Sequence, residues 1–588
     1  MVRWLIQIAQ WLFAILGEDT LRRLVQRVFV RTQRELLVAT HHVADAQQER
    51  LLKNLARNAG TVFGQSRNFS GISSVDEYRE QVPIQSWDEV APWVDRMVAG
   101  EDNVLVDENV FFYATTSGTT GRRKLIPVTS AFVEECRVAT KVLFRSTLLE
   151  MPRAFAGKRL SMRSPNIETL APGIEAGSIT LALSGGLSGA ESQLDAVPSA
   201  VYRVSDFSSR YRLCLRFAAQ EHVTLASAVN PSTLLLFAQT LETHWQSLAD
   251  ALEAGELGEG LVLTPDEERI LRPLARKSVT AAERVRTSVS AHGTPRMIDV
   301  WPDLAGLVCW KGGSAPWYLG QLPKSYGRIP VLDYGYVASE GCFGAPLSSE
   351  GADSLLLPHG HFFEFMDVDS VAEIRAGQRP TRLLHELESG KSYYVVVTTA
   401  AGLYRYDMND IVEVQGFVDS APLVVFRQKG GAMSSVTGEK LGEAHVVQAM
   451  ARARQKLDLD FAGFACAPLL PREANEPPRY LLAVDPGAHA LSPAEGDALA
   501  CAFDLELQSC NEEYQSKRAS LRLGNTEYAP LPAHALVNHR AARVRDGAPD
   551  AHVKVPHISP TGDLLLRLGL GDSAASHAAR LLGAETTR

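Results

Sequence analysis

Short apolar segments that end in loops rich in glycine, serine and threonine are the feature that most constrains the fold. The clearest segments are residues 223–229, 307–310 and 329–334, and a polar loop or a helix start follows each one. Segments of this length and composition are typical of buried strands, and helical patterns separate them. Strands that alternate with helices indicate an open α/β sheet, in which ligands bind beyond the carboxyl ends of the strands. We therefore expect an α/β fold with a binding site among these loops.

One loop is denser in polar groups than the others. Residues 115–124 read Thr-Thr-Ser-Gly-Thr-Thr-Gly-Arg-Arg-Lys, after a predicted strand at 110–114 and before a helix predicted to start near Ala131. Backbone N–H groups and hydroxyls in such a loop can converge on an anion, and Lys124 adds a full positive charge. The spacing excludes a Walker A loop, which has four residues between its glycines and Lys-Ser/Thr directly after the second. We expect a phosphate site here.

Length, charge and cysteine content exclude several classes of protein. The 588 residues allow a large domain and a smaller one, with 45% hydrophobic and 22% charged residues, as in ordinary globular proteins. The net charge of −9 gives no bulk electrostatic argument for binding nucleic acid. The seven cysteines are scattered and form no CxxC pair, so we expect neither a zinc site nor a disulfide framework. A reducing cytoplasm fits this pattern best.

The N-terminus, Met1–Gly17, is strongly apolar and carries one charged residue, Arg3. Polar residues interrupt it, so it is short for a bilayer span, and no signal-peptidase site follows. The spacing of its apolar and polar residues predicts that it belongs to an amphipathic N-terminal helix over residues 1–30. We expect this helix to pack on the body of the protein, and the alternative is contact with a membrane surface. We expect helix to continue from Thr20 to about Ala59, with one apolar face formed by Leu21, Leu24, Val25 and Val28.

From about residue 360 the pattern changes to β-structure. Residues 362–365, 393–398 and 411–414 are predicted strands of a meander. A candidate hinge lies near Lys429, before residues that predict an α+β arrangement: a helix at 443–456, a strand at 480–484 and a helix at 493–518. We therefore predict an N-terminal domain over residues 1–432 and a C-terminal domain over 433–588.

Four motifs resemble those of adenylate-forming enzymes. Residues 116–124 match the phosphate-loop signature [ST]SGTTGxxK throughout. Gly-Gly-Ser at 312–314 resembles the turn that lines the adenine pocket, and Tyr-Val-Ala-Ser-Glu at 336–340 resembles YGxTE. Tyr-Arg-Tyr-Asp-Met-Asn-Asp at 404–410 resembles YRTGD with an altered middle.

Finer details resemble one family, the Gretchen Hagen 3 auxin-responsive family of acyl acid–amido synthetases. They are the sequences at 61–64, 336–344, 361–365, 401–406 and 553–556, and the resemblance runs from about residue 30 to 565. It implies a large adenylate-forming N-terminal domain, with mixed and parallel sheets, helices and a β-barrel-like subdomain. It also implies a smaller, mobile α+β C-terminal domain.

The resemblance implies an ATP- and Mg²⁺-dependent ligase. Such an enzyme adenylates a small carboxylic acid, releases pyrophosphate, and transfers the acyl group to the amine of an amino acid. Two alternatives stay open: transfer to the thiol of coenzyme A, and a non-catalytic ligand-binding homologue. The sequence does not indicate which acid, which acceptor or which oligomeric state.

The resemblance also assigns roles to individual residues. Glu340 is the expected Mg²⁺ ligand, and Asp410 is expected to bind the ribose hydroxyls in preference to Asp407. Lys440 and Lys554 compete for the role of a lysine that the small domain brings in, while Lys124 acts from the loop. The other expected nucleotide contacts are Thr116, Ser117, Gly118, Thr119, Thr120, Gly121, Gly313, Ser314, Tyr336, Ser339 and Arg427.

Overall fold

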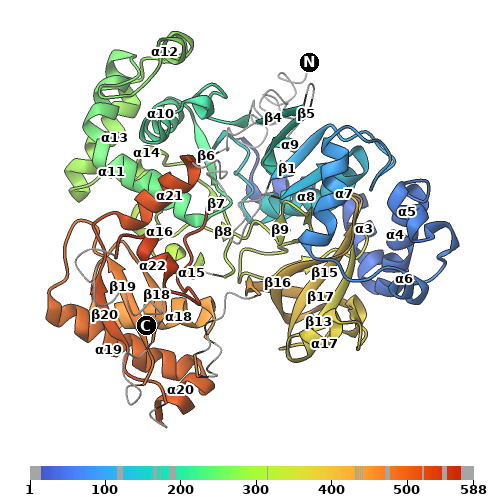
Figure 1. Cartoon of the computed structure of the whole chain (residues 1–588). Coiled ribbons are helices and arrows are strands. Elements are labelled where there is room, and N and C mark those ends of the chain that lie inside the picture. The colour runs from blue at the N-terminus through green and yellow to red at the C-terminus, as the bar shows by residue number, and fades with distance from the viewer. Residues whose placement is uncertain are drawn as a thin grey trace. The chain divides into compact units, whose positions relative to one another are not determined.

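The computed structural model describes residues 15–115, 124–162, 168–171, 174–183, 194–313, 315–430, 434, 436–437, 439, 441–470, 477–519, 522–545 and 553–570. These residues form two compact units (Figure 1). Apart from residues 313–317, the first unit holds the described chain up to Phe426, and the second holds Arg427 and the residues after it. Each unit is described by itself below.

A mixed sheet in the first unit carries both ends of the predicted phosphate loop. Its strand order is β2-β1-β5-β4, and β1 (Phe112–Thr115) runs antiparallel to β2 (Leu125–Val128), with Thr115 opposite Leu125. The other two strands are β4 (Glu168–Ala171) and β5 (Ile174–Gly177). The predicted helix follows as α8 (Ser130–Glu150), capped by the Thr129 side chain. Loop residues 116–123 lie outside the described residues.

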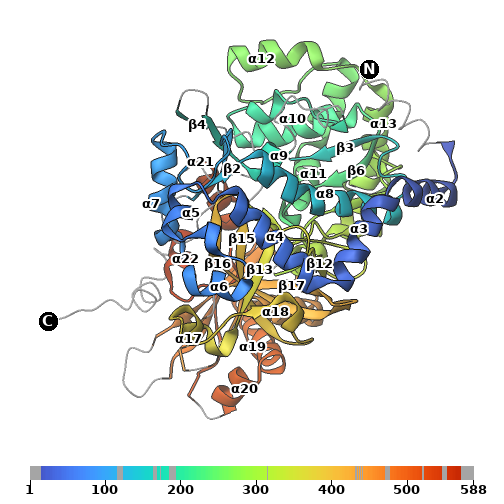
Figure 2. The ribbon, with the colours of Figure 1, turned by 90° about the vertical axis from the view of Figure 1, so that its right-hand side faces the viewer.

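A second, fully parallel sheet confirms the α/β prediction. Its strands stand in chain order: β3 (Lys158–Ser161), β6 (Val223–Ser227), β7 (Gly306–Val308) and β8 (Val331–Leu332). The helices α10 (Phe207–Ala219), α11 (Pro231–Ala254) and α13 (Val279–His292) gather beside β6, as both ribbon views show (Figures 1 and 2). The remaining helices after the first sheet are α9 (Ile179–Leu183), α12 (Pro265–Leu271), α14 (Met297–Val300), α15 (Ala315–Leu319) and α16 (Leu322–Tyr326).

The β-rich part is an antiparallel sheet of seven strands in the order β11-β12-β17-β16-β15-β13-β14. The three predicted strands belong to it, as β13 (Phe362–Asp367), β15 (Ser392–Thr399) and β16 (Leu403–Val418). The other strands of this sheet are β11 (Gly344–Ala345), β12 (Ser354–Leu356), β14 (Arg382–Leu383) and β17 (Ala421–Lys429). Helix α17 (Val371–Arg375) packs on β13. Strands β9 (Val337–Ala338) and β10 (Gly341–Cys342) form a separate hairpin.

Strand β16 departs from the prediction, because it starts at Leu403 rather than Ile411 and is bulged twice. Arg405 and Asn409 have left-handed φ values of 48° and 51°. The register slips at both places relative to β15, since Leu403 faces Thr399, Tyr406 faces Val397, and Ile411 faces Tyr394. Bulges leave extra residues on one strand and redirect their side chains, which is why the 404–410 motif escaped prediction as strand.

The N-terminal helical region is three helices rather than one. They are α2 (Glu18–Val28), α3 (Val30–His41) and α4 (Val43–Arg57), broken where Phe29 and His42 leave helical geometry. The predicted apolar face of α2 is only half buried: Leu21 and Val25 are in the core, whereas Leu24 and Val28 are exposed. Residues 1–14 lie outside the described part. Among described residues, no helix is long and apolar enough to cross a membrane. Three helices follow: α5 (Val62–Ser66), α6 (Val75–Gln81) and α7 (Trp87–Val98).

The second unit is α+β. Its sheet is β18 (Gly463–Leu469), β19 (Arg479–Asp485) and β20 (Glu527–Pro530), and α18 (Glu443–Leu457) packs on α19 (Pro493–Cys510). The single helix predicted at 493–518 is wrong: Asn511 turns the chain out of helical geometry, and its side chain caps α20 (Glu512–Ala519) by accepting from Tyr514 N at 2.8 Å. The remaining helices are α21 (Ala535–Arg545) and α22 (Asp563–Arg567).

Candidate active site

Lys124, at the end of the predicted phosphate loop, lies between aromatic rings and a carboxylate. Its Nζ donates to the Tyr406 hydroxyl at 2.7 Å and lies 3.8 Å from Glu340 Oε1. The same ammonium lies 5.4 Å from the ring centre of Tyr406 and 5.9 Å from that of Trp87, within the range of cation–π attraction. The Lys124 side chain is 25% exposed. The charge is therefore positioned by neighbours while it stays accessible to a ligand.

Backbone pairing explains how Trp87 and Tyr406 meet, although they are far apart in the chain. Gln85 forms a parallel bridge with Tyr406, because Gln85 N donates to Arg405 O and Asp407 N donates to Gln85 O, both at 2.9 Å. The Gln85 side chain also donates to Tyr404 O at 2.7 Å. This pairing fixes the start of α7 against β16 and sets the Trp87 ring at a right angle to that of Tyr406.

Tyr336 and Asp410 form the second part of the site. The Tyr336 hydroxyl donates to Asp410 Oδ2 at 2.8 Å, and both side chains are buried. Burial, and next the negative charge of Asp410, raise the pKa of Tyr336 well above its ordinary value, so the phenol stays protonated and donates. The Tyr336 ring packs near Phe343 and parallel to Phe426. Tyr336 therefore positions Asp410, and its stacking on adenine stays a prediction.

The two competing aspartates have different surroundings. Arg375 forms an ion pair with Asp407, with 2.7 Å between Arg375 Nη2 and Asp407 Oδ2. Asp407 Oδ1 also accepts a hydrogen bond from Asn409 N. Asp410 is only 3% exposed, in the second bulge of β16, directly beside Tyr336. The geometry thus favours Asp410 over Asp407 as the residue turned toward a ligand.

Arg405, which belongs to the same motif, has a structural role. Its guanidinium forms a buried ion pair with Glu364 at 2.9 Å and donates to the carbonyls of Arg79 and Val82. The guanidinium thereby ties β16 to β13 and to the end of α6. Because its N–H groups are already hydrogen-bonded within the protein, this buried ion pair holds the fold together rather than binding a ligand.

Ser339 and Glu340 connect this part to the start of the predicted phosphate loop. Ser339 Oγ donates to Thr115 O at 2.8 Å, at the end of β1 where the loop begins. Glu340 follows and is only 4% exposed, with Lys124 as its cationic neighbour. Described residues contain no cluster of three metal-ligating side chains. A lone carboxylate beside the predicted phosphate loop nevertheless fits Mg²⁺, which in nucleotide sites takes one or two carboxylates, phosphate oxygens and water.

The loops after β7 and β8 are joined through Asp333. Its carboxylate accepts from the backbone N–H groups of Lys311 and Gly335, each at 2.6 Å. Burial raises the pKa of Asp333 to about 6. In the loop after β7, a side chain at Gly312 would place its Cβ 2.9 Å from the carbonyl oxygen of Phe426, so only glycine fits without a shift. Both loops are thus held rigidly at the carboxyl edge of the parallel sheet.

Several predicted residues belong to the second unit. Gly313 has a left-handed φ of 61°. Arg427 lies close enough to His445 to affect it: burial lowers the pKa of His445 most, and the positive charge of Arg427 lowers it further. Lys554 is exposed between buried Val553 and Val555. The residues Thr116, Ser117, Gly118, Thr119, Thr120, Gly121, Ser314 and Lys440 lie outside the described residues.

Sequence reasoning missed Trp87, Gln85 and Tyr406 as site residues. Tyr406 stands inside a quoted motif, where its alternation with the buried Tyr404 could have drawn attention. Trp87 and Gln85 carry no local signal, because only pairing with a distant strand brings them to Lys124.

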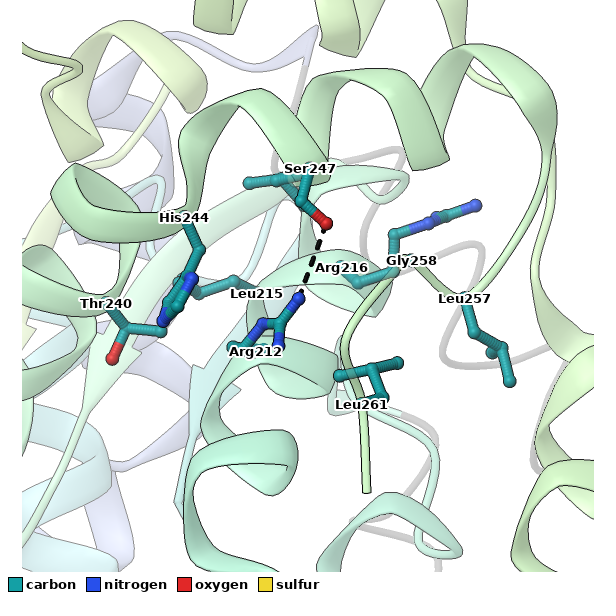
Figure 3. Close-up of a pocket in the computed structure, with 10 residues that line it drawn as sticks. Arg212, Leu215, Arg216, Thr240, His244, Ser247, Leu257, Gly258 and Leu261 are labelled. Atoms are coloured by element: carbon teal, nitrogen blue, oxygen red, sulfur yellow. Dashed lines mark hydrogen bonds between the residues drawn. The ribbon is translucent and has the colours of Figure 1, made fainter. Parts of the chain in front are cut away.

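Neither of two surface hollows in the first unit supplies an obvious acid pocket. One, lined by residues of α10, α11 and the following loop, has a volume of about 20 Å³, and the Arg212 guanidinium crosses it to Ser247 Oγ at 3.3 Å (Figure 3). That space suits about one water molecule. The other, about 520 Å³, lies beside α16 and the start of β8, away from the loops that hold the site.

Comparison with known proteins identifies similar chains. Models of the N-terminal, central and C-terminal domains of the GH3 family match residues 32–331, 354–429 and 444–563. The indole-3-acetic acid-amido synthetase GH3.8 of Oryza sativa subsp. indica is 28% identical over 73% of this chain and 74% of its own length. The jasmonoyl–L-amino acid synthetase GH3.5 of Oryza sativa subsp. japonica is 25% identical over 84% of this chain and 89% of its own length. The solved GH3.15 acyl acid amido synthetase superposes with a TM-score of 0.76 at 20% identity, covering 90% of this chain and 93% of that one, which shows a shared fold.

Proposed function

Because this chain belongs to the GH3 family, we propose that it is an ATP-dependent acyl acid–amido synthetase. It converts a small carboxylic acid to an acyl-adenylate with release of pyrophosphate, and then passes the acyl group to the amine of an amino acid. The curated relatives are named as amido synthetases, and a structural neighbour was solved with the acid 2,4-DB. The observation that carries the proposal is the pairing of Lys124 with Glu340 and of Tyr336 with Asp410 within one unit, where the charge of Glu340 also acts on the pKa of Tyr336.

The chemistry needs positioning and charge more than covalent work by the protein. A carboxylate is a poor acyl donor because oxide leaves badly, whereas AMP leaves well once the acid oxygen has attacked the α-phosphorus. Lys124 supplies positive charge where the β- and γ-phosphates develop negative charge as pyrophosphate departs. Asp410 accepts hydrogen bonds from the ribose hydroxyls, with Tyr336 holding one of its oxygens, and so aligns the nucleotide.

Glu340 is the residue that would hold Mg²⁺, and the bound ion would screen the phosphate charges. The carboxylate is buried and has the ammonium of Lys124 as a neighbour, so its negative charge is compensated before any ion arrives. We also propose that residues 433–588 form a mobile lid, which brings Lys554 or Lys440 to the nucleotide for adenylation. The lid then rotates, and the amine attacks the acyl-adenylate in the second half-reaction. We also propose a cytoplasmic enzyme, since all seven cysteines are free thiols.

The test is pyrophosphate release with ATP, Mg²⁺ and a panel of aryl, indole and aliphatic acids, first for the wild type and then for Lys124→Ala. We expect the variant to lose about a hundredfold in rate, as when one charge-stabilising group is removed from an active site. Lys277→Ala, at an exposed lysine, is the matched control and should keep the wild-type rate.

Three results would contradict the proposal. Equal rates for Lys124→Ala and the wild type would remove the loop from the mechanism. Pyrophosphate release without any amide product, but with a thioester when coenzyme A is added, would move the chain to the acyl-CoA ligases. No pyrophosphate with any acid would indicate a non-catalytic homologue.

A further inference from the structure

A carboxylate and an imidazole are buried together near the candidate site. Glu135, in the second turn of α8, and His361, directly before β13, are 1% and 0% exposed, and Glu135 Oε2 lies 3.0 Å from His361 Nδ1. The carboxylate also accepts from Asn54 Nδ2 at 2.9 Å and from Ala400 N at 2.7 Å, and the guanidinium of Arg50 lies 3.7 Å away. Burial raises the pKa of Glu135, but the His361 ring, Arg50 and the Ala400 N–H together outweigh this effect, so its pKa is lowered and it stays ionised.

The backbone around His361 is held by one buried side chain of α4. Gln47 Nε2 donates to His361 O at 2.7 Å and to Pro358 O at 2.6 Å, and Gln47 Oε1 accepts from Phe363 N at 2.8 Å. The His361 ring is therefore fixed from two directions, by Gln47 through the backbone and by Glu135 beside Nδ1. Buried polar contacts of this kind restrict a side chain to one arrangement.

The other edge of the His361 ring contacts the β9–β10 hairpin. The two-residue turn of this hairpin is Ser339–Glu340, and Gly341 follows as the first residue of β10. A side chain at Gly341 would place its Cβ 3.1 Å from His361 Nε2 and 2.6 Å from Phe343 Cε1. Only glycine allows the hairpin to pack this closely on both rings.

Phe343 connects the same ring to Tyr336. The centre of the Phe343 ring lies 5.1 Å from that of His361, in an edge-to-face arrangement, and 5.1 Å from that of Tyr336. Phe343 N also donates to Tyr336 O at 2.9 Å, next to the pairing of the hairpin. His361 thus contacts the residue that follows Glu340 and the residue that is hydrogen-bonded to Tyr336.

Stability alone does not explain a polar pair at this place. Neither ring nitrogen of His361 has an aligned hydrogen bond among the described residues, since the 3.0 Å contact with Glu135 is not directed as one. A buried polar network that is only partly hydrogen-bonded is less stable than an apolar core of the same volume. In a native protein such a group calls for a role other than stability.

We propose that His361 is a positioning residue of the adenylation site and that Glu135 holds it in place. The ring supports the hairpin on the side of α8, which packs on β10, so that Glu340 and Tyr336 stand where the nucleotide requires them. His361 is fully buried and does not touch the nucleotide. The inference rests on the proposed function, because Glu340 and Tyr336 act on a nucleotide only in that reaction.

The experiment separates the two edges of the His361 ring with two variants of the full chain. His361→Asn keeps an amide near the Nδ1 position, beside Glu135, and removes the edge that contacts Gly341. His361→Gln reaches the Nε2 position and keeps that contact. ATP affinity is measured by calorimetry without acid, KM for ATP and kcat by pyrophosphate release, and stability by the thermal midpoint, with both ATP measurements made where every variant is folded.

We expect His361→Asn to bind ATP about tenfold more weakly and to raise KM by the same factor, because the hairpin loses its support. His361→Gln should recover most of the wild-type affinity. Glu135→Gln keeps the shape of the side chain and removes its charge, so it should weaken ATP binding in the same direction as His361→Asn.

A matched control is a buried polar side chain elsewhere in the same unit. Arg216, on α10, is 1% exposed and donates to the carbonyl oxygens of Ala251, Glu256 and Arg276. Arg216→Met should lower the thermal midpoint and leave ATP affinity, KM and kcat unchanged. It therefore shows how far a loss of stability alone changes these measurements.

Wild-type ATP affinity in His361→Asn, with only a lower thermal midpoint, would make His361 a fold contact and overturn the inference while the proposed function stands. An equal loss of affinity in His361→Gln would remove the contact with Gly341 as the cause, and an equal loss in Arg216→Met would assign the effect to stability. Unchanged affinity in Glu135→Gln would remove Glu135 from the inference. If the wild type neither binds ATP nor releases pyrophosphate, the proposed function fails, and the inference fails with it.

Discussion

The hydroxyl of Tyr406 determines where the ammonium of Lys124 rests. Burial raises the pKa of Tyr406 well above its ordinary value, so the group stays neutral and accepts from Lys124 without competing for its charge. Glu340 draws the same ammonium from the other side at 3.8 Å. A flexible lysine is held by these contacts in a narrow set of rotamers, and its ordering is complete before ATP arrives.

Tyr406→Phe should weaken ATP binding while leaving the fold intact, because the buried ring is kept and only the acceptor for Lys124 is lost. We expect KM for ATP to rise about tenfold, equivalent to about 1.4 kcal/mol, with a smaller change in kcat. Steady-state pyrophosphate release at varied ATP measures both. Tyr393→Phe is the control, since that buried hydroxyl only accepts from Glu388 N. An unchanged KM in Tyr406→Phe would show that the hydroxyl does not position Lys124.

At the scale of elements, the site depends on loops and bulges fixed by backbone contacts. Asp333 joins the loops after β7 and β8, Gln85 pairs with β16, and the second bulge of β16 turns Asp410 inward. Gly312 lets the loop after β7 approach the carbonyl oxygen of Phe426. These contacts are rigid, so a small displacement of one loop moves a nucleotide contact rather than being absorbed.

Gly312→Ala should disturb the site through a backbone clash. Its Cβ would lie 2.9 Å from the carbonyl oxygen of Phe426, and this pushes the loop after β7 away from β17. We expect a rise in KM for ATP of at least roughly tenfold, with about 1–3 kcal/mol lost in stability from the overpacked contact. ATP titration and the thermal midpoint measure the two effects. Gly416→Ala, in β16 with nothing within 4 Å of the new Cβ, should behave as wild type. If both variants match wild type, the loop does not need this close approach.

At the scale of the whole molecule, two compact units divide the predicted roles. The first contains Lys124, Glu340, Tyr336 and Asp410, and the second contains Arg427 and Lys554. Lys554 is exposed on a segment whose next residues pair with β18: Cys466 N donates to His557 O, and Ser559 N donates to Cys466 O, both at 2.8 Å. The lysine is thus carried on a fixed support within its unit.

Lys554→Ala should separate the two half-reactions. If this lysine completes the adenylation site, acid-dependent ATP–pyrophosphate exchange should fall about a hundredfold, while aminolysis of a supplied acyl-adenylate changes little. Lys456→Ala, an exposed lysine in the last turn of α18, should leave both rates unchanged. An exchange rate as fast as wild type in Lys554→Ala would leave Lys440 as the remaining candidate.

The predictable parts were those written in local patterns. The α/β class, the strands at 223–227 and 362–367, and the helix starting after Thr129 follow from apolar periodicity and capping, which act over a few residues. The family, too, is carried by short motifs such as the match at 116–124, now supported by matches along most of the chain. Helix breaks at Phe29, His42 and Asn511 were missed, because the residues around them keep helical periodicity.

The amino-acid sequence alone shows the residue types that adenylation chemistry requires, because each motif is local. Their working arrangement is not local. Trp87 and Tyr406 meet around Lys124 only through the bridge of Gln85 to β16, and Asp410 is distinguished from Asp407 only by a bulge and by Arg375. The exposure of Leu24 and Val28 was equally hidden, since helical periodicity shows which residues share a face but not whether another element covers it. Only the packing of distant segments decides such contacts.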